Sequence, residues 1–259
     1  MTPIVILASR SRTSYTLINH MAAHFDVALV VFEASQTRKI LRYRLKKLGW
    51  WTVANQLAFS VYDRAVIRRR SRPMIDTLLA DYDDSPPDAR LRCVDVEKVN
   101  TAAVREQIAA AGPGCVVVSG TGILGKKLLA AAPVFINVHV GITPRYRGVH
   151  GGFRAIYENR LDLVGVTVHE IDPGVDTGGI IAQATVPVDP AADTFRTLPV
   201  KQYIAALPLM QQAVADALEG SLHTYQRDDM QSKQWYSPTF AEYAVFVRNL
   251  RATAAGTSA

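Results

Sequence analysis

The chain has little cysteine and no long apolar run. Only two cysteines, Cys93 and Cys115, occur among its 259 residues, which excludes a disulfide scaffold and gives no zinc-binding pattern. No apolar stretch approaches the roughly 20 residues that span a bilayer, and no hydrophobic signal segment precedes the first predicted strand. Hydrophobic residues make up 49% of the chain and charged residues 20%, which excludes a disordered chain. These features predict a cytoplasmic globular protein with a sizeable core.

Acidic residues are almost missing from one segment. Between residues 36 and 72, eleven lysines and arginines accompany a single acid, Asp63, so this segment carries +10 and the rest of the chain −4. Apolar residues between the charges predict an amphipathic helix before Gly49 and a second helix after it. This basic helical insertion, 36–72, indicates an anionic partner (a substrate phosphate, an acidic membrane surface or nucleic acid) or else a solvated helix face.

Strand-like and helix-like segments alternate along the chain. The apolar run 3–8, a polar turn, a helix and a second apolar run at 26–32 form the βαβ pattern typical of a parallel sheet. We expect an α/β fold with a mostly parallel, Rossmann-like sheet and flanking helices, one domain over 1–220, and a short C-terminal extension over 221–259. Further strands are predicted at 91–96, 115–119, 134–140, 164–171 and 180–186, and helices at 102–111, 124–131, 152–159, 194–218 and 241–251.

Two polar side chains share one face of a predicted strand. Asn137 and His139 are two residues apart, so they point the same way, and the glycine-rich loop 172–179 adds the carboxylates Asp172 and Asp176. A His can take the proton of an attacking amine, an Asn amide can stabilise an oxyanion, and a carboxylate can orient the imidazole. These residue types suit acyl transfer to an amine. The alternative is that Asn137 caps the strand end and His139 is an ordinary core residue.

Four blocks of sequence carry a family resemblance. They are FINVH at 135–139, PRYRG at 144–148, GVTVH at 165–169 and DPGVDTG at 172–178. Their order and spacing resemble the formyltransferase family, which includes glycinamide ribonucleotide transformylase, methionyl-tRNA formyltransferase and the sugar N-formyltransferases. The resemblance is strong from about 115 to 183 and weaker before 32.

The resemblance implies a co-substrate, N10-formyltetrahydrofolate, and no metal. It implies that Asn137 stabilises the oxyanion, that His139 transfers protons and that Asp176 holds His139 in place. Contacts with the pterin are implied for two segments: Thr121, Gly122, Ile123 and Leu124, through the backbone, and Ile171, Asp172, Pro173, Gly174 and Val175. The chain departs from the family at Gly141, where a hydroxyl residue is frequent, and in its basic insertion.

The amine that accepts the formyl group is less well defined. The loop 9–14 contains no glycine, whereas glycinamide ribonucleotide transformylases carry a glycine-rich phosphate loop there, and Tyr203 stands where they have an acidic substrate residue. About forty residues follow position 220, too few for the barrel with which methionyl-tRNA formyltransferase grips tRNA. Both roles remain alternatives, with nucleic acid the less favoured partner.

The resemblance therefore favours a nucleotide-linked amino sugar. The most specific form is a GDP- or dTDP-linked 4-amino-4,6-dideoxy sugar, such as GDP-perosamine, in the biosynthesis of a surface polysaccharide (O-antigen of lipopolysaccharide). Cationic groups and N–H donors would bind its diphosphate. The expected substrate contacts are Ser9, Arg10, Arg147, Gly148, His150 and Tyr203.

Some residues keep a second interpretation. The basic insertion, with Trp50 and Trp51 beside it, can instead make a peripheral membrane contact with anionic lipid or dock on a partner assembly. The C-terminal extension can form a homodimer contact. His150 fits a surface loop as well as a substrate contact, and His169 fits a structural role.

Overall fold

A seven-stranded sheet forms the centre of the protein. The computed structural model describes residues 2–34 and 37–256, with the backbone alone for 37–42. The strand order is β3-β2-β1-β4-β5-β7-β8, and β7 and β8 each run antiparallel to the preceding strand. The prediction of a mostly parallel sheet is confirmed. The five parallel strands are β1 (Ile4–Ala8), β2 (Val27–Glu33), β3 (Cys93–Val96), β4 (Cys115–Ser119) and β5 (Phe135–His139), and the other two are β7 (Gly165–Glu170) and β8 (Ile180–Thr185).

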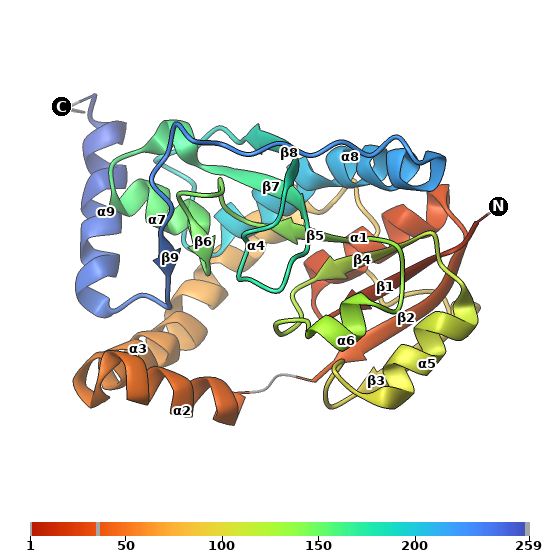
Figure 1. Cartoon of the computed structure of the whole chain (residues 1–259). Coiled ribbons are helices and arrows are strands. Elements are labelled where there is room, and N and C mark those ends of the chain that lie inside the picture. Colours follow the sequence, from red (N-terminus) through yellow and green to blue (C-terminus); the bar gives the residue numbers. More distant parts are fainter. Residues whose placement is uncertain (1, 35–36, 257–259) are drawn as a thin grey trace.

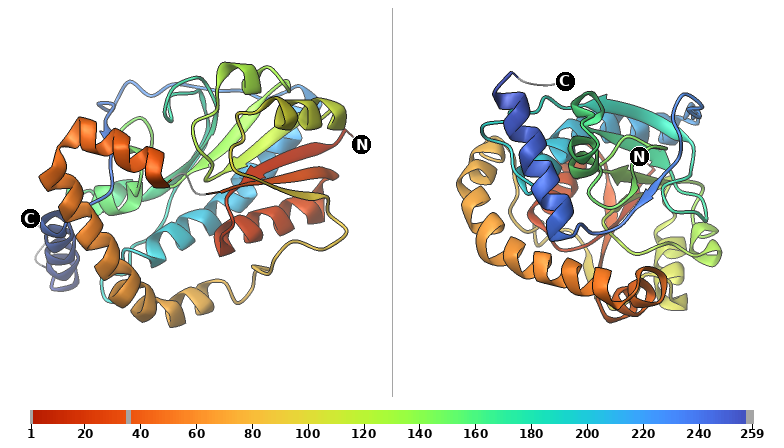
Figure 2. Two further views of the ribbon diagram at one scale, coloured as in Figure 1. Left: turned by 90° about the horizontal axis from the view of Figure 1, so that it is seen from below. Right: turned by 90° about the vertical axis from the view of Figure 1, so that its left-hand side faces the viewer.

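Helices cover both faces of this sheet (Figures 1 and 2). Side chains alternate along β1, so that Ile4 and Ile6 pack under α1 (Arg12–His24) and α8 (Thr197–Glu219), while Val5 and Leu7 pack under α5 (Ala102–Ala111) and α6 (Lys126–Leu129). Strands buried on both faces read as continuous apolar runs because neither side of the pleat meets water. This explains why β1, β2 and β4 are the clearest strands in the sequence.

The basic insertion folds as three helices between β2 and β3. They are α2 (Thr37–Leu48), α3 (Trp50–Tyr62) and α4 (Arg68–Leu78), and one π-helical turn, η1 (Asp63–Ile67), joins the last two. The predicted helices on either side of Gly49 are confirmed, although the helical segment continues six residues past the expected boundary at 72. Asp63, the single acid of this segment, is buried and accepts hydrogen bonds from Arg196 at the start of α8. This ion pair anchors the insertion to the main domain.

The C-terminal extension packs against the insertion. Its helix α9 (Phe240–Ala254) begins with a capping box at Thr239 and contacts both α7 (Gly151–Tyr157) and α3. The ring of Phe59 on α3 lies 5.7 Å from that of Phe240 and 5.1 Å from that of Tyr243. The insertion and the extension, far apart in sequence, therefore share one apolar core, to which the 3-10 turn η2 (Leu161–Leu163) also contributes.

A short two-stranded ribbon joins the extension to the loop after β5. Strand β9 (Gln234–Trp235) pairs in parallel with β6 (Arg147–Gly148). The Trp235 indole N–H also donates to the carbonyl of Arg145 at 3.3 Å. Within the described residues, no helix is long and apolar enough to cross a bilayer.

Candidate active site

The pairing of β5 with β7 places the predicted catalytic side chains. Asn137 lies opposite His169 and His139 opposite Thr167, while the intervening Val138 packs into the core beneath α1 and α8. Since side chains alternate along a strand, these four polar residues point to the other face of the sheet. The expectation that Asn137 and His139 share a face is confirmed.

Asp176 reaches this face from the loop between β7 and β8. Its Oδ2 lies 3.4 Å from Nδ1 of His139 and accepts a hydrogen bond of 2.8 Å from the backbone N–H of Gly148. The other carboxylate oxygen, Oδ1, lies 3.6 Å from Nε2 of His169. Asp176 has a positive φ of 49°, a conformation that Asp and Asn adopt more readily than most residues. The structure thus brings Asp176, His139 and Asn137 into one cluster.

Hydrogen bonds define which nitrogen of His139 can take a proton. Nε2 lies 2.6 Å from the carbonyl oxygen of Tyr146, and because a carbonyl only accepts, Nε2 carries the hydrogen. In the neutral ring Nδ1 is then the basic nitrogen, and it faces Asp176. A proton gained at Nδ1 would be stabilised by the neighbouring carboxylate.

Asp176 is held in its charged form. Burial alone would raise the pKa of its carboxyl group, but the neighbouring imidazoles of His139 and His169 and the hydrogen bond from the Gly148 N–H together hold that pKa well below its usual range. A carboxylate that stays ionised can orient an imidazole without competing for its proton. Asp176 therefore acts as a fixed negative charge beside His139.

His169 orients Asn137. Its Nδ1 lies 2.8 Å from the carbonyl of Glu170, so Nδ1 carries the hydrogen and Nε2 accepts from the Asn137 amide at 3.1 Å. One amide hydrogen of Asn137 is fixed by this bond, and the second has no partner within the described part of the chain. His169, for which the sequence favours a structural role, thus contacts two of the three predicted catalytic residues.

A buried glutamate holds the turn after β4. Glu33, only 7% exposed at the end of β2, accepts hydrogen bonds from the backbone N–H groups of Gly122 at 2.6 Å and Val99 at 3.0 Å. Asn100 binds the same turn, donating to the carbonyl of Ile123 at 2.8 Å. Leu124 is buried beneath it. Neither Glu33 nor Asn100 was identified from the sequence, because the residues that they bind in the turn lie 89 and 23 positions away.

The second predicted cofactor segment, 171–175, is ordered by its own side chains. Asp172 accepts from the N–H of Gly174 at 2.9 Å and from the hydroxyl of Thr177 at 2.7 Å. Arg147 donates to the carbonyl of Val175 at 3.1 Å. Ile171 is partly buried and Pro173 is exposed. In the sheet, β4 and β7 are the two neighbours of β5, so the turn 121–124 and this loop flank Asn137.

The predicted substrate contacts are divided between two places. Arg147 and Gly148 lie beside Asp176, because Arg147 donates to the carbonyl of Val175 and the Gly148 N–H donates to Asp176 itself. Tyr203 lies near the ends of β1 and β4, with its hydroxyl 3.3 Å from that of Ser119. The backbone of Gly120 approaches Ser9 there. The substrate roles of these residues stay predictions.

Two of the predicted contacts have unexpected surroundings. Arg10 makes two hydrogen bonds of 2.8 Å to Asp95 and lies over the ring of Phe32, so its charge is already paired within the chain. His150 packs against the ring of Phe195 at 4.7 Å. Burial, together with the nearby charges of Arg154, Arg196 and Arg44, lowers the pKa of His150 to about 3. The His150 side chain is partly exposed. With its pKa lowered in this way, it is neutral at physiological pH.

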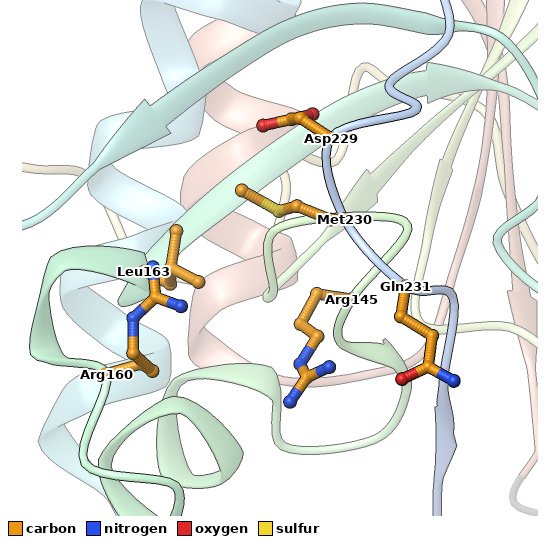
Figure 3. A pocket seen from close by; sticks show the side chains of 6 residues that line it. All are labelled: Arg145, Arg160, Leu163, Asp229, Met230 and Gln231. Carbon is orange, nitrogen blue, oxygen red and sulfur yellow. The ribbon is translucent and has the colours of Figure 1, made fainter.

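A separate cavity lies behind the Pro144–Gly148 loop and does not contain the site. Its volume is about 250 Å³. The side chains that line it (Figure 3) include no predicted catalytic, cofactor or substrate residue. Its two cations are already paired, Arg145 with Glu158 and Arg160 with Asp162. The cavity is formed by Arg145, Arg160, Leu163, Asp229, Met230 and Gln231.

A comparison with protein families identifies the class of this chain. The family model described as formyl transferase matches residues 26–211. The chain belongs to the formyl transferase family.

The curated relatives align with only part of this chain. Methionyl-tRNA formyltransferase of Albidiferax ferrireducens is 32% identical over 125 residues, which is 48% of this chain and 38% of that protein. The corresponding protein of Anaeromyxobacter sp. (strain K) is 38% identical over 115 residues, which is 42% of this chain and 36% of that protein. The chain thus matches less than half the length of these curated relatives.

Solved structures share the fold over nearly the whole chain. A sugar N-formyltransferase from Shewanella sp. FDAARGOS_354 has a TM-score of 0.59 and 14% identity, covering 96% of this chain and 88% of that one. Glycinamide ribonucleotide transformylase 1 from Symbiobacterium toebii has a TM-score of 0.59 and 22% identity, covering 88% and 92%. At these identities the likeness shows the fold.

A glycine links the C-terminal extension to the site. Gly148 has a φ of 96°, and a Cβ there would lie 2.3 Å from the carbonyl oxygen of Trp235. We expect Gly148→Ala to lower the free energy of unfolding by about 1–3 kcal/mol and to reduce turnover, because the N–H that binds Asp176 must move. Gly220→Ala is the matched control, since Gly220 has a φ of 73° with no neighbouring atom within 4 Å. Equal losses of stability and unchanged turnover in both variants would contradict this role.

Proposed function

We propose that this chain is an N-formyltransferase that transfers a formyl group from N10-formyltetrahydrofolate to an amine by direct attack. The observation that carries the proposal is the contact of Asp176 with His139 and His169, beside Asn137, in a member of the formyl transferase family. The co-substrate supplies an electrophilic formyl carbon. What remains for the protein is to move a proton, to stabilise an oxyanion and to position both reactants.

The hydrogen bonds support the following sequence of steps. Nδ1 of His139 takes the proton of the attacking amine, since Nε2 is bound to the Tyr146 carbonyl. Asp176, ionised and 3.4 Å away, stabilises the imidazolium. The second amide hydrogen of Asn137 donates to the oxygen that gains charge, an interaction that becomes stronger as the charge develops. His139 then returns the proton to the leaving nitrogen.

The turn 121–124 and the loop 171–175 fit a folate on either side of Asn137. In the turn, the Gly122 N–H and the Ile123 carbonyl are already bound by Glu33 and Asn100, so a pterin would bind the remaining backbone groups. The role of these two internal bonds is to keep those groups in a fixed direction, which lowers the entropy lost on binding.

Glu33 offers a test of this turn. Replacing Glu33 by Gln leaves one acceptor oxygen for two backbone N–H groups and puts an amide donor against one of them. We expect the KM for N10-formyltetrahydrofolate to rise on the order of tenfold, since a buried donor left without a partner costs about 1–3 kcal/mol, with a smaller change in kcat. Glu97→Gln, on an exposed residue of the same region, is the control. An unchanged KM in Glu33→Gln would argue against folate binding at this turn.

We further propose a nucleotide-linked 4-amino-4,6-dideoxy sugar as the amine, in surface polysaccharide biosynthesis. Support comes from the extent of the structural likeness, which for a sugar N-formyltransferase from Shewanella and a 4-N formyltransferase from Francisella tularensis includes 96% and 95% of this chain. Sequence relatives named methionyl-tRNA formyltransferase align over half of their length or less. Arg147, beside Asp176, is the cation best placed to meet an anionic substrate.

A substrate panel tests this proposal. Purified protein and N10-formyltetrahydrofolate would be mixed with GDP- and dTDP-linked 4-amino sugars, glycinamide ribonucleotide or methionyl-tRNA, while tetrahydrofolate release is recorded. We expect turnover of one nucleotide sugar alone. Faster turnover of glycinamide ribonucleotide or of methionyl-tRNA would replace the sugar by that substrate, and no release with any amine would contradict formyl transfer itself.

A further inference from the structure

Helix α3 is apolar on both of its sides. None of its 13 residues is charged. Val53 and Phe59 are buried against the protein, while Trp50 and Trp51 on the outer side are 71% and 68% exposed. A helix that carries large apolar side chains on both of its sides is normally covered on both sides. Within the described chain, no other segment covers the apolar outer side of α3.

The exposed apolar surface continues onto α9. Tyr62, the last residue of α3, lines a groove of about 580 Å³ together with Phe240, Tyr243 and Val247 of α9, and Arg248 and Arg251 lie at the same groove. Figure 2 (right) shows α9 and the α3–α4 segment on the side of the molecule that faces the viewer. We name this surface the docking face: Trp50, Trp51, Leu57 and Val61 on α3, with the groove beside Tyr62.

The charges around the docking face have one sign. Exposed cations precede α3 at Lys46 and Lys47 and follow it at Arg64 and Arg68. In 43–70 and 240–254 the only acids are Asp63 and Glu242. Both are paired inside the chain, with Arg196 and Arg154 respectively. Within 43–70 and 240–254, no acidic side chain is therefore left to neutralise the docking face.

This combination identifies the class of partner. A second copy of the chain would set like charges against each other, which costs free energy. A nucleic acid would satisfy the arginines but gives aliphatic side chains such as Leu57 and Val61 no apolar contact. The surface of an anionic bilayer offers both a negative potential and an apolar layer, and Trp side chains are enriched at this depth. We propose that the docking face binds peripherally to an anionic membrane surface.

Intrinsic fluorescence provides a direct test. The chain has three tryptophans, and the third, Trp235, is only 9% exposed, so a change of polarity around the docking face is reported by Trp50 and Trp51. With vesicles of phosphatidylglycerol and phosphatidylcholine we expect a blue shift of the emission and co-sedimentation of the protein. Vesicles of phosphatidylcholine alone should give neither.

Variants separate the apolar and the charged contributions. Trp50→Ser with Trp51→Ser should abolish vesicle binding, and Arg64→Gln with Arg68→Gln should weaken it at least tenfold. Tyr82→Ser with Tyr225→Ser, two exposed aromatic residues away from the docking face, should bind as the wild type does. All variants should keep the wild-type thermal unfolding temperature within a few degrees and transfer formyl groups normally in vesicle-free buffer.

Several results would reject the proposal. They are equal binding to neutral and anionic vesicles, undiminished binding by the double Trp variant, and capture of oligo(U) RNA without vesicle binding. A vesicle-free dimer that becomes monomeric in the double Trp variant would instead assign the docking face to self-association. None of these outcomes bears on the catalytic proposal, because the docking face and the Asn137–His139–Asp176 cluster share no residue.

Discussion

Replacing His139 by Gln is expected to lower kcat by about 10²–10⁴-fold, the usual contribution of a positioned acid–base group. The amide nitrogen of Gln can take the place of Nε2 of His139 and still donate to the carbonyl of Tyr146, so the loop after β5 keeps this contact. The variant loses the nitrogen that faces Asp176, and with it the only base that the mechanism uses. Steady-state turnover with saturating substrates measures the effect.

The control for this variant is His223→Gln, on an exposed residue of the extension. It should turn over at the wild-type rate. If His139→Gln retained more than about a tenth of the wild-type kcat while remaining folded, proton transfer at Nδ1 would be wrong, since even the smallest acid–base contributions are about 10²-fold.

Replacing Asp176 by Asn is expected to lower kcat by at least about 10²-fold. The substitution preserves shape, and Asn tolerates the positive φ of 49° at this position, so the loop can keep its course. The amide oxygen of Asn can still accept the hydrogen bond from the Gly148 N–H. What disappears is the negative charge that stabilises protonated His139, which is why we expect the loss in kcat and little change in the KM for either substrate.

The same variant makes a prediction about pH. The pKa of Asp176 is depressed in the folded protein, while in the unfolded chain the pKa of an Asp side chain is about 3.9. Its contribution to stability is therefore present above about pH 4 and is lost as the pH falls through the folded value. The difference in unfolding free energy between wild type and Asp176→Asn should shrink from pH 7 to pH 3 in urea titrations. Asp228→Asn, on an exposed acid, should show no such trend.

The sequence predicted the fold because the strands that matter most are buried on both faces. In β1 and β4 all five residues are buried. Such strands are continuous apolar segments, which can be recognised in the sequence without knowing which strands they pair with. The direction of β7 and β8 was not assigned. The connection between them, 171–179, is too short for the crossover of a dozen or more residues that parallel neighbours need, so an antiparallel pair was within reach of the sequence.

The candidate site was predictable where its residues are close in sequence. Asn137 and His139 share a strand, and period-two alternation alone puts them together. His169 enters the site only through the β5–β7 register, which pairs it with Asn137. Glu33 reaches Gly122 across 89 residues. Nothing local in the sequence around Glu33 signals this contact.

The charged side chains were the least predictable. Arg10 follows β1 and was expected to contact the substrate, but it binds Asp95, and the nearby Arg12 binds Asp76 and Asp84. These acids come from β3, α4 and a loop whose positions depend on the whole fold. For the same reason the packing of the insertion against α9 could not be foreseen, because it depends on the contacts of Phe59 with Phe240 and Tyr243.

The most direct test of direct formyl transfer follows a labelled formyl group. Protein would be mixed with N10-[¹⁴C]formyltetrahydrofolate and quenched with acid, with and without the amino sugar that turns over in the substrate panel. We predict no label on the protein in either case, no tetrahydrofolate release without the amine, and one labelled formamide for each tetrahydrofolate released with it. Acid-stable label on the protein, or release that does not depend on the amine, would contradict transfer by Asn137, His139 and Asp176 without a covalent intermediate.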